Sequence, residues 1–209
     1  SDKAKQLKPS GIRKFFDVVV DIKDAISLGV GEPDFVTPWN IRHAAITSLK
    51  KGYTQYTSNA GLLELREQIA KYLKKYGLTY DYKKEIIVTV GASEAIDISL
   101  RAIINPGDEV LVPEPSYVSY APCVELCGGV AVPIECTAAD CFKLMPENVS
   151  KVITKKTKAV IFPYPNNPSG AVMEKEYLEP VAELFKKHDL IVLSDEIYSE
   201  LTYIEGGHI

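Results

Sequence analysis

Short apolar runs rich in β-branched residues alternate along this chain with longer stretches of helical periodicity, and this alternation restricts the fold more than any other feature. The runs show continuous apolar character, which indicates strands covered on both faces, as in a parallel sheet. Strands separated by helices predict an α/β fold with right-handed crossovers. We expect five strands, at residues 85–90, 109–112, 130–133, 159–162 and 190–194.

Three longer segments carry helical periodicity. Residues 62–76 place their apolar side chains on one face, and Gly77 supplies a stop. Residues 93–104 follow the first predicted strand directly, and residues 174–188 form the third segment. Pro180 inside that third segment predicts a late helix start or a kink. The first sixty residues are rich in turn-forming types and look like an arm with connecting loops.

The composition excludes several classes of protein. A length of 209 residues fits one large domain, and 46% hydrophobic with 25% charged residues is typical of a soluble globular protein. A net charge of -4 gives no electrostatic footprint for nucleic acid or an anionic membrane. No apolar run approaches the ~20 residues of a membrane span, and the polar N-terminus lacks a secretory core. We expect a cytoplasmic protein.

Four cysteines lie close together in sequence, at Cys123, Cys127, Cys136 and Cys141. Their spacing is not CxxC, and the histidines are far away in sequence. We therefore expect buried, reduced thiols and no metal site.

The junction between a predicted strand and a predicted helix at residues 88–95 could hold an anion. The strand runs into Gly91, and Ser93 opens a helix whose free N–H groups, together with the hydroxyl, suit a phosphate. The alternative, which is commoner for such a segment, is a plain cap in which Ser93 is the N-cap and Glu94 favours the helix dipole.

A second junction follows the predicted strand at 159–162 and reads Pro-Asn-Asn-Pro-Ser-Gly over residues 165–170. Pro168 pushes Asn167 towards extended geometry, which can hold its amide in a fixed direction. The carboxyl edge of an open α/β sheet is where ligands bind. The alternative is an ordinary Asn-Pro turn.

Asp195 follows the last apolar run directly, and Tyr198 comes three residues later. A buried carboxylate is costly unless it is paired. A protonated heteroaromatic ring nitrogen would pair with Asp195, Tyr198 could add a hydroxyl, and Tyr117 could add an aromatic face near another strand end. The alternatives are a helix cap for Asp195 and ordinary core packing for Tyr117.

Taken in order, these segments resemble the class I/II aminotransferases, which are fold-type I pyridoxal-phosphate enzymes. The resemblance extends from residue 11 to residue 203, and residues 195–203 are most similar to the aspartate/aromatic/N-acetyl-diaminopimelate branch. Its strongest elements are Gly31-Glu32-Pro33-Asp34-Phe35, Tyr56 with Asn59-Ala60-Gly61, Gly91-Ala92-Ser93, Asn166-Asn167-Pro168-Ser169-Gly170 and Ser194-Asp195-Glu196-Ile197-Tyr198.

The resemblance implies a three-layer α/β/α large domain with a mostly parallel sheet. Residues 1–45 would form an N-terminal arm and part of the small domain, and residues 46–209 the truncated pyridoxal-phosphate-binding large domain. In the family, the strands after the Asp-x-x-Tyr motif return to the middle of the sheet, between 85–90 and 190–194. We therefore expect an incomplete sheet with unpaired edges.

The resemblance also assigns contacts to the cofactor, pyridoxal 5'-phosphate. Ala92 and Ser93 would hold its phosphate, and Tyr117 would stack on its pyridine ring. Asn167 and Tyr198 would bond its phenolic oxygen.

Three further roles follow from the resemblance. Asp195 would keep the ring nitrogen protonated and make the ring an electron sink. Gly31 is similar to the backbone contact that the family makes to the substrate carboxylate. Tyr56 is similar to the residue that reaches the phosphate of the partner subunit, which implies a homodimer with shared active sites.

The implied activity is transfer of an amino group from an L-amino acid to a 2-oxo acid. The family's Schiff-base lysine lies in a Ser-x-Ser-Lys-like segment that we expect beyond residue 209, so no catalytic residue is expected within the chain and the fragment alone should be inactive. The alternatives are a pyridoxal-phosphate-dependent C–S lyase or decarboxylase of the same fold, and a non-catalytic α/β partner-binding module. A dinucleotide-binding domain is disfavoured, because the turn at Gly91 lacks the later glycines of that fingerprint.

Overall fold

The computed structural model describes residues 4–5, 7, 35–205 and 207–208. Contacts within the chain divide it into two compact units, residues 90–209 with residues 1–8, and residues 9–89. Each unit is described by itself. Gly31 and most of the expected arm at residues 1–45 lie outside the described residues, and the expected domain division after residue 45 stays a prediction.

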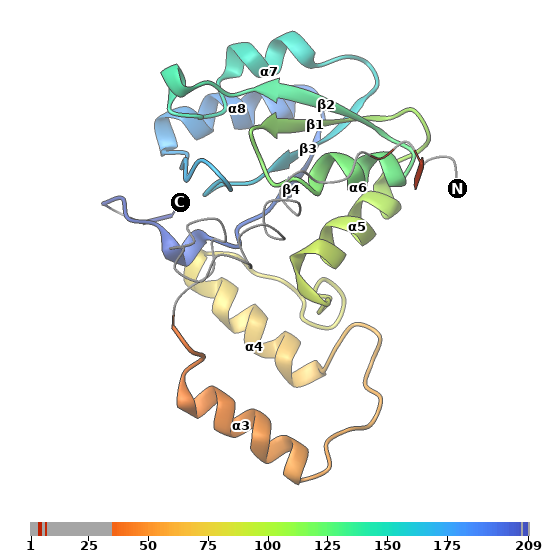
Figure 1. The fold of residues 1–209 in the computed structure, drawn as a ribbon, viewed down its shortest axis with the longest axis vertical. Helices are drawn as coiled ribbons and strands as arrows, with labels where there is room; N and C mark the ends of the chain where they lie inside the picture. The colour runs from red at the N-terminus through yellow and green to blue at the C-terminus, as the bar shows by residue number, and fades with distance from the viewer. Residues whose placement is uncertain (1–3, 6, 8–34, 206, 209) are drawn as a thin grey trace, which may run out of the picture. The chain divides into compact units, whose positions relative to one another are not determined.

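Four parallel strands form the centre of the larger unit, in the order β2-β1-β3-β4 (Figure 1). The strands are β1 (Glu109–Glu114), β2 (Val130–Glu135), β3 (Thr157–Phe162) and β4 (Ile191–Ser194). Four of the five predicted strands and their parallel pairing are thereby confirmed.

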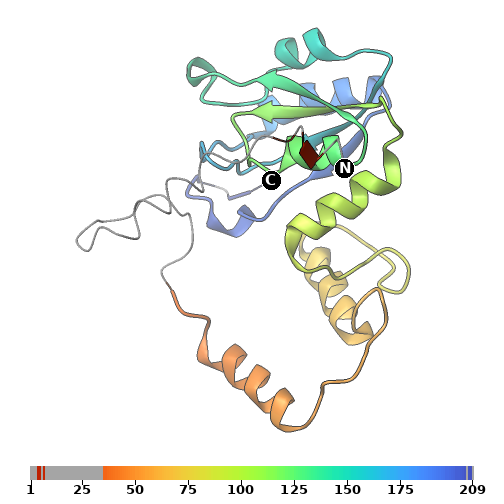
Figure 2. The ribbon, with the colours of Figure 1, turned by 45° about the vertical axis from the view of Figure 1, so that its right-hand side comes forward.

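Helices cover both faces of this sheet, so the unit has the expected three-layer α/β/α arrangement (Figures 1 and 2). Neighbouring residues of β1 explain why the apolar runs are continuous: Val110 packs with one buried cluster and Leu111 with the other. The helices are α5 (Gly91–Ile103) and α6 (Tyr120–Leu126) on one face, and α7 (Pro146–Val152) and α8 (Lys175–Lys187) on the other. Short 3-10 turns lie at η2 (Ala138–Asp140) and η3 (Ser199–Leu201).

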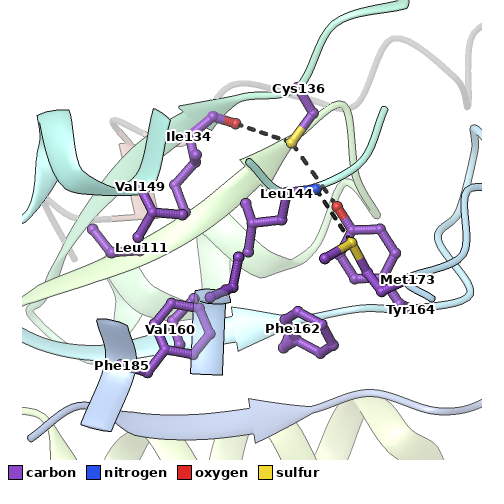
Figure 3. Packing of buried hydrophobic residues seen from close by; sticks show 11 residues of the cluster. Leu111, Ile134, Cys136, Leu144, Val149, Val160, Phe162, Tyr164, Met173 and Phe185 are labelled. Carbon is purple, nitrogen blue, oxygen red and sulfur yellow. Dashed lines mark hydrogen bonds between the residues drawn. The ribbon is translucent and has the colours of Figure 1, made fainter. Parts of the chain in front are cut away.

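The face under α7 and α8 holds a cluster of aromatic and sulfur-containing side chains (Figure 3). The Phe162 ring lies 4.9 Å from that of Tyr164 and 6.4 Å from that of Phe185, between centroids. The Tyr164 hydroxyl donates to the carbonyl oxygen of Phe142 (3.1 Å). Because a buried hydroxyl without a partner is costly, this bond allows a tyrosine to fill a core position.

The helix predicted at 174–188 begins at Lys175 and runs through Pro180, so the predicted late start is wrong. A proline inside a helix costs about 3 kcal/mol. Val181 and Phe185, both buried against the sheet, offset that cost because a fully buried side chain of this kind contributes about 1.5–3 kcal/mol.

The predicted strand at 85–90 does not form. Within the smaller unit, the Val88 amide donates to the carbonyl oxygen of Ala60 (3.0 Å), and no strand of the described residues pairs with this segment. A strand exists only as part of a ladder, and β-branched composition alone cannot supply the neighbour.

The sequence predicts that the outer strand β4 is covered on both faces, but in the structure it is partly exposed. Ile191 and Val192 are 39% and 44% exposed, and among the described residues β4 pairs with β3 alone. This agrees with the expectation of an incomplete sheet with an unpaired edge.

The smaller unit contains α3 (Trp39–Lys50), α4 (Leu63–Leu73) and η1 (Lys74–Tyr76). The helix predicted at 62–76 is confirmed, with Gly77 in the left-handed region (φ 77°) as its stop. The helix α3 forms in a segment where the sequence predicts connecting loops. It buries none of its residues, and its large apolar side chains, Trp39, Ile41, Ile46 and Leu49, are exposed.

All four cysteines are free thiols. Cys136 is buried, Cys123 and Cys127 are half-buried and Cys141 is exposed, so the expectation of burial is confirmed only for Cys136 and is wrong for Cys141. Among the described residues no three His, Cys, Asp or Glu side chains gather as metal ligands. The helices of the described ranges are all too short or too polar to cross a bilayer.

Candidate functional site

Asp195 lies at the carboxyl edge of the sheet, one residue after β4. Its amide donates to the carbonyl oxygen of Phe162 (3.1 Å), which extends the β3–β4 ladder by one bond. Its Oδ1 atom accepts from the amide of Ile197 (3.2 Å), so the carboxylate also shapes the turn that follows. The alternative of Asp195 as a helix cap is not what forms, because the next helix, η3, has Tyr198 at its N-cap position and no side-chain cap.

The second carboxylate oxygen of Asp195 is bound by Tyr120, the first residue of α6. The Tyr120 hydroxyl donates to Oδ2 at 2.8 Å, and the residue is 3% exposed. Burial, followed by the hydrogen bond and the charge of Asp195, raises the pKa of Tyr120 well above its usual value. Tyr120 therefore stays a neutral phenol that can only donate to this carboxylate.

Tyr120 was missed in the sequence. The motif Tyr-x-x-Tyr at residues 117–120 holds two phenols, and the resemblance drew attention to the first. A tyrosine that opens a helix directly after a strand end was the available signal, but its partner lies 75 residues further along the chain.

Tyr117 packs against Tyr120 edge to face, with ring centroids 5.5 Å apart and an interplanar angle of 79°. Tyr117 is half-buried and packs on the cluster beneath α5 and α6, so the core-packing alternative describes part of its role. The charges of Tyr198 and Tyr117 make the smallest contributions to the raised pKa of Tyr120, so both phenols lie in the neighbourhood of the Tyr120 hydroxyl.

Asn167 and Tyr198 form a second contact of the site. The Asn167 side-chain amide lies 3.4 Å from the Tyr198 hydroxyl, to which it donates. The turn itself is held by the buried Asn166, whose Oδ1 accepts from the hydroxyl of Ser169 (2.9 Å) and whose carbonyl accepts from the amide of Gly170 (2.9 Å). Because Asn166 makes the turn, Asn167 is left half-exposed with its amide directed to Tyr198.

The start of α5 leaves Ala92 and Ser93 exposed. Gly91 has a φ of +77°, and the amide of Val90 donates to the Glu94 carboxylate. The N-cap residue is Val90, without a side-chain cap, so the alternative of Ser93 as the N-cap is not what forms. No hydrogen bond among the described residues joins Ala92 or Ser93 to the group around Asp195.

Tyr56 belongs to the smaller unit and is fully exposed there. The larger unit thus brings together Asp195 with Tyr117 and with the unforeseen Tyr120, and separately Asn167 with Tyr198. The Asp195 carboxylate can pair with a protonated nitrogen of a flat ring, and the Asn167 amide with the Tyr198 hydroxyl can bond an oxygen on such a ring.

Comparison with known proteins connects this arrangement to one family. The family model described as "Aminotransferase class I and II" matches residues 23–207. The protein YugH of Bacillus subtilis (strain 168) is 55% identical over 206 residues, which are 98% of this chain and 53% of that protein. An aspartate aminotransferase of Pyrococcus abyssi is 46% identical, over all of this chain and 54% of the relative.

The fold of the chain is also similar to solved aminotransferase structures. The aspartate aminotransferase from Thermus thermophilus with maleate superposes with a TM-score of 0.93 at 40% identity, over 100% of this chain and 56% of that one. Two other relatives are named as a probable N-acetyl-LL-diaminopimelate aminotransferase and an aromatic-amino-acid aminotransferase. The chain spans about half the length of the curated relatives that it matches.

Proposed function

Because the chain belongs to the class I and II aminotransferase family, we propose that the complete protein transfers an amino group from an L-amino acid to a 2-oxo acid, with pyridoxal phosphate as cofactor. The single observation that carries the proposal is the Asp195 carboxylate, which lies at the carboxyl edge of a parallel sheet and accepts a hydrogen bond from Tyr120. Such a group suits a cationic ring nitrogen better than it suits any anionic ligand.

The side chains around Asp195 fit this cofactor chemically. The carboxylate suits a protonated ring nitrogen, and the Asn167 amide with the Tyr198 hydroxyl suits a ring oxygen. Tyr117 offers an aromatic face. Pyridoxal phosphate, when bound, supplies an electron sink for the negative charge that develops at the amino acid's Cα.

Each residue of the chain would have a distinct task. Asp195 would hold a proton at the ring nitrogen, because opposite charges favour each other's ionised form. Asn167 and Tyr198 would orient the ring through its phenolic oxygen. Ala92 and Ser93 would bind the phosphate with the free N–H groups and the hydroxyl at the start of α5, where the helix dipole favours an anion.

Two further roles rest on the family resemblance. Gly31 would contact the substrate carboxylate through its backbone, and Tyr56 would reach the phosphate of a partner subunit in a cytoplasmic homodimer. The complete exposure of Tyr56 supports a role outside its own unit.

Residues 1–209 would supply side chains that bind the cofactor but not the lysine that the family uses to move the Cα proton. None of the lysines of this chain stands in a Ser-x-Ser-Lys-like segment. We infer that the 209-residue chain by itself does not turn over. Names of relatives point to aspartate, an aromatic amino acid or N-acetyl-LL-diaminopimelate as the first amino donors to try.

The test follows the amino group itself. The complete protein is incubated with pyridoxal phosphate, 2-oxoglutarate and ¹⁵N-labelled L-aspartate or L-tyrosine, and ¹⁵N-glutamate is measured by mass spectrometry. We expect label transfer, reduced roughly 100-fold or more in Asp195→Asn, because a neutral amide cannot favour a charged ring nitrogen.

Other outcomes would overturn the proposal in different ways. Release of ammonia and pyruvate from a cysteine conjugate, without label transfer, would identify a C–S lyase. Failure of the complete protein to bind pyridoxal phosphate would indicate a non-catalytic module. Label transfer by residues 1–209 alone would refute their inferred inactivity.

A further inference from the structure

The hydrogen bond between Tyr120 and Asp195 joins two distant parts of the sheet edge. Tyr120 opens α6 after β1, whereas Asp195 follows β4, and β3 lies between these two strands. The 2.8 Å bond therefore crosses the edge where the candidate site lies. Its donor is 3% exposed, so water does not compete for the hydroxyl.

The chain supplies donors to both oxygens of the Asp195 carboxylate. Oδ1 accepts from the Ile197 amide at 3.2 Å, and Oδ2 accepts from the Tyr120 hydroxyl at 2.8 Å. Two donors on opposite oxygens fix the rotation of the carboxylate plane. The Ile197 bond lies within one turn of the chain, so only the Tyr120 bond ties that plane to another element.

The chemical nature of the donor also matters. A phenol held neutral by burial and by the adjacent carboxylate gives its proton in a hydrogen bond and cannot take a second one from Asp195. A hydrogen bond to a charged acceptor is stronger than one between neutral groups. The bond is therefore a directed one, in which Tyr120 is always the donor and the Asp195 carboxylate oxygen always the acceptor.

We propose that Tyr120 is a positioning residue that acts on the cofactor through Asp195, by fixing the orientation of the carboxylate. This inference rests on the proposed function, because it assumes that the Asp195 carboxylate meets a protonated ring nitrogen. Tyr120 itself touches neither cofactor nor substrate in this assignment.

The test measures the dissociation constant of pyridoxal phosphate from the complete protein, by the change in cofactor absorbance on binding. Tyr120→Phe keeps the ring and its contact with Tyr117 and removes one oxygen atom. We expect binding to weaken about tenfold or more, because a hydrogen bond to a charged group is lost. Asp195→Asn keeps the shape of the side chain and should weaken binding at least as much.

The double variant distinguishes a positioning role from a structural one. If Tyr120 acts through the carboxylate, Tyr120→Phe should have little further effect in the Asp195→Asn background. Tyr164→Phe is the matched control, since it removes a buried phenol hydroxyl that bonds the Phe142 carbonyl and belongs to the other core cluster from Tyr120. It should lower the melting temperature and leave the dissociation constant unchanged.

The outcomes separate the two proposals. If the wild-type protein binds no pyridoxal phosphate, the proposed function and this inference fall together. If it binds and Tyr120→Phe binds equally well, the inference alone is overturned. The inference is also overturned if Tyr120→Phe weakens cofactor binding by the same factor in the wild type and in Asp195→Asn. It is overturned as well if Asp195→Asn binds the cofactor with wild-type affinity.

Discussion

The Nζ atom of Lys143 lies 2.8 Å from the Oε2 atom of Glu174, so an ion pair joins the segment after η2 to the residue that precedes α8. The ammonium group also lies 3.9 Å from the centroid of the Tyr177 ring. Lys143 is largely buried, whereas Glu174 is 40% exposed, and solvent screens part of the attraction.

Replacement of Glu174 by Gln should lower the free energy of unfolding by about 0.5–1 kcal/mol at neutral pH. The hydrogen bond from Lys143 lowers the pKa of Glu174, so its contribution is present above the ordinary carboxyl value and is lost as the pH falls through the lower folded value. The difference between wild type and Glu174→Gln in urea denaturation should therefore shrink in acid. Glu179→Gln, which breaks an exposed pair at 3.6 Å with Lys175, should cost no more than about 0.5 kcal/mol.

Gly61 should not tolerate a side chain. An added Cβ would lie 2.6 Å from the Cβ of Val88, and the φ of Gly61 is +95°. Gly61→Ala should cost about 2–4 kcal/mol of unfolding free energy, from backbone strain and the clash together. Gly77→Ala is the control, because its φ is +77° with no atom within 4 Å, and should cost only about 1–2 kcal/mol. If chemical denaturation gives the same loss of unfolding free energy for both variants, the Val88 side chain must move aside to accept the new methyl group.

The phosphate role of Ser93 predicts a selective loss of affinity. Ser93→Ala should raise the dissociation constant of pyridoxal phosphate about tenfold, because one donor to a charged group is lost. The unfolding free energy should change by less than about 0.5 kcal/mol, since the exposed hydroxyl caps no helix. Ser150→Ala removes a helical hydroxyl that bonds the Pro146 carbonyl, and it should leave cofactor affinity unchanged. Unchanged affinity in Ser93→Ala would assign the phosphate to other donors.

The four thiols should differ in reactivity. Burial raises the pKa of the Cys123 and Cys136 thiols, and the thiolate is the form that attacks a disulfide reagent. Cys141 is exposed and should react first with 5,5'-dithiobis(2-nitrobenzoate) at pH 8. Cys141→Ser should abolish the fast phase, and Cys136→Ser should leave it. A fast phase that survives in Cys141→Ser would contradict this assignment.

The sequence predicts strands well where both faces of a run are buried by the chain itself. In β1 and β3, consecutive residues pack into opposite clusters, and their continuous apolar runs reflect this directly. The segment 85–90 has a similar composition, but no strand of the described part of the chain lies beside it, because pairing depends on residues distant in sequence. The helix α3 was missed for the opposite reason, since it forms without burying any residue.

In the candidate site, too, the sequence predicts some residues and misses contacts that depend on distant parts of the chain. Asn167, Asp195 and Tyr198 could be placed at the sheet edge because each follows an apolar run. The contact of Tyr120 with Asp195 depends on the order β1-β3-β4, which no local pattern contains. Asn166 and Asn167 look alike in the sequence, and the hydrogen bonds of the turn decide which one faces Tyr198.

The bond from the Asp195 amide to the Phe162 carbonyl makes the position of the Asp195 carboxylate depend on the register between β3 and β4. A slip of β4 on β3 by one residue would turn Asp195 to the other face of the sheet, and a slip by two residues would move its carboxylate by about 6–7 Å along the strand. No hydrogen bond to Tyr120 survives a displacement of that size. A population of misaligned molecules would therefore appear in a cofactor titration as a fraction that does not bind, and not as a weaker affinity shared by all molecules.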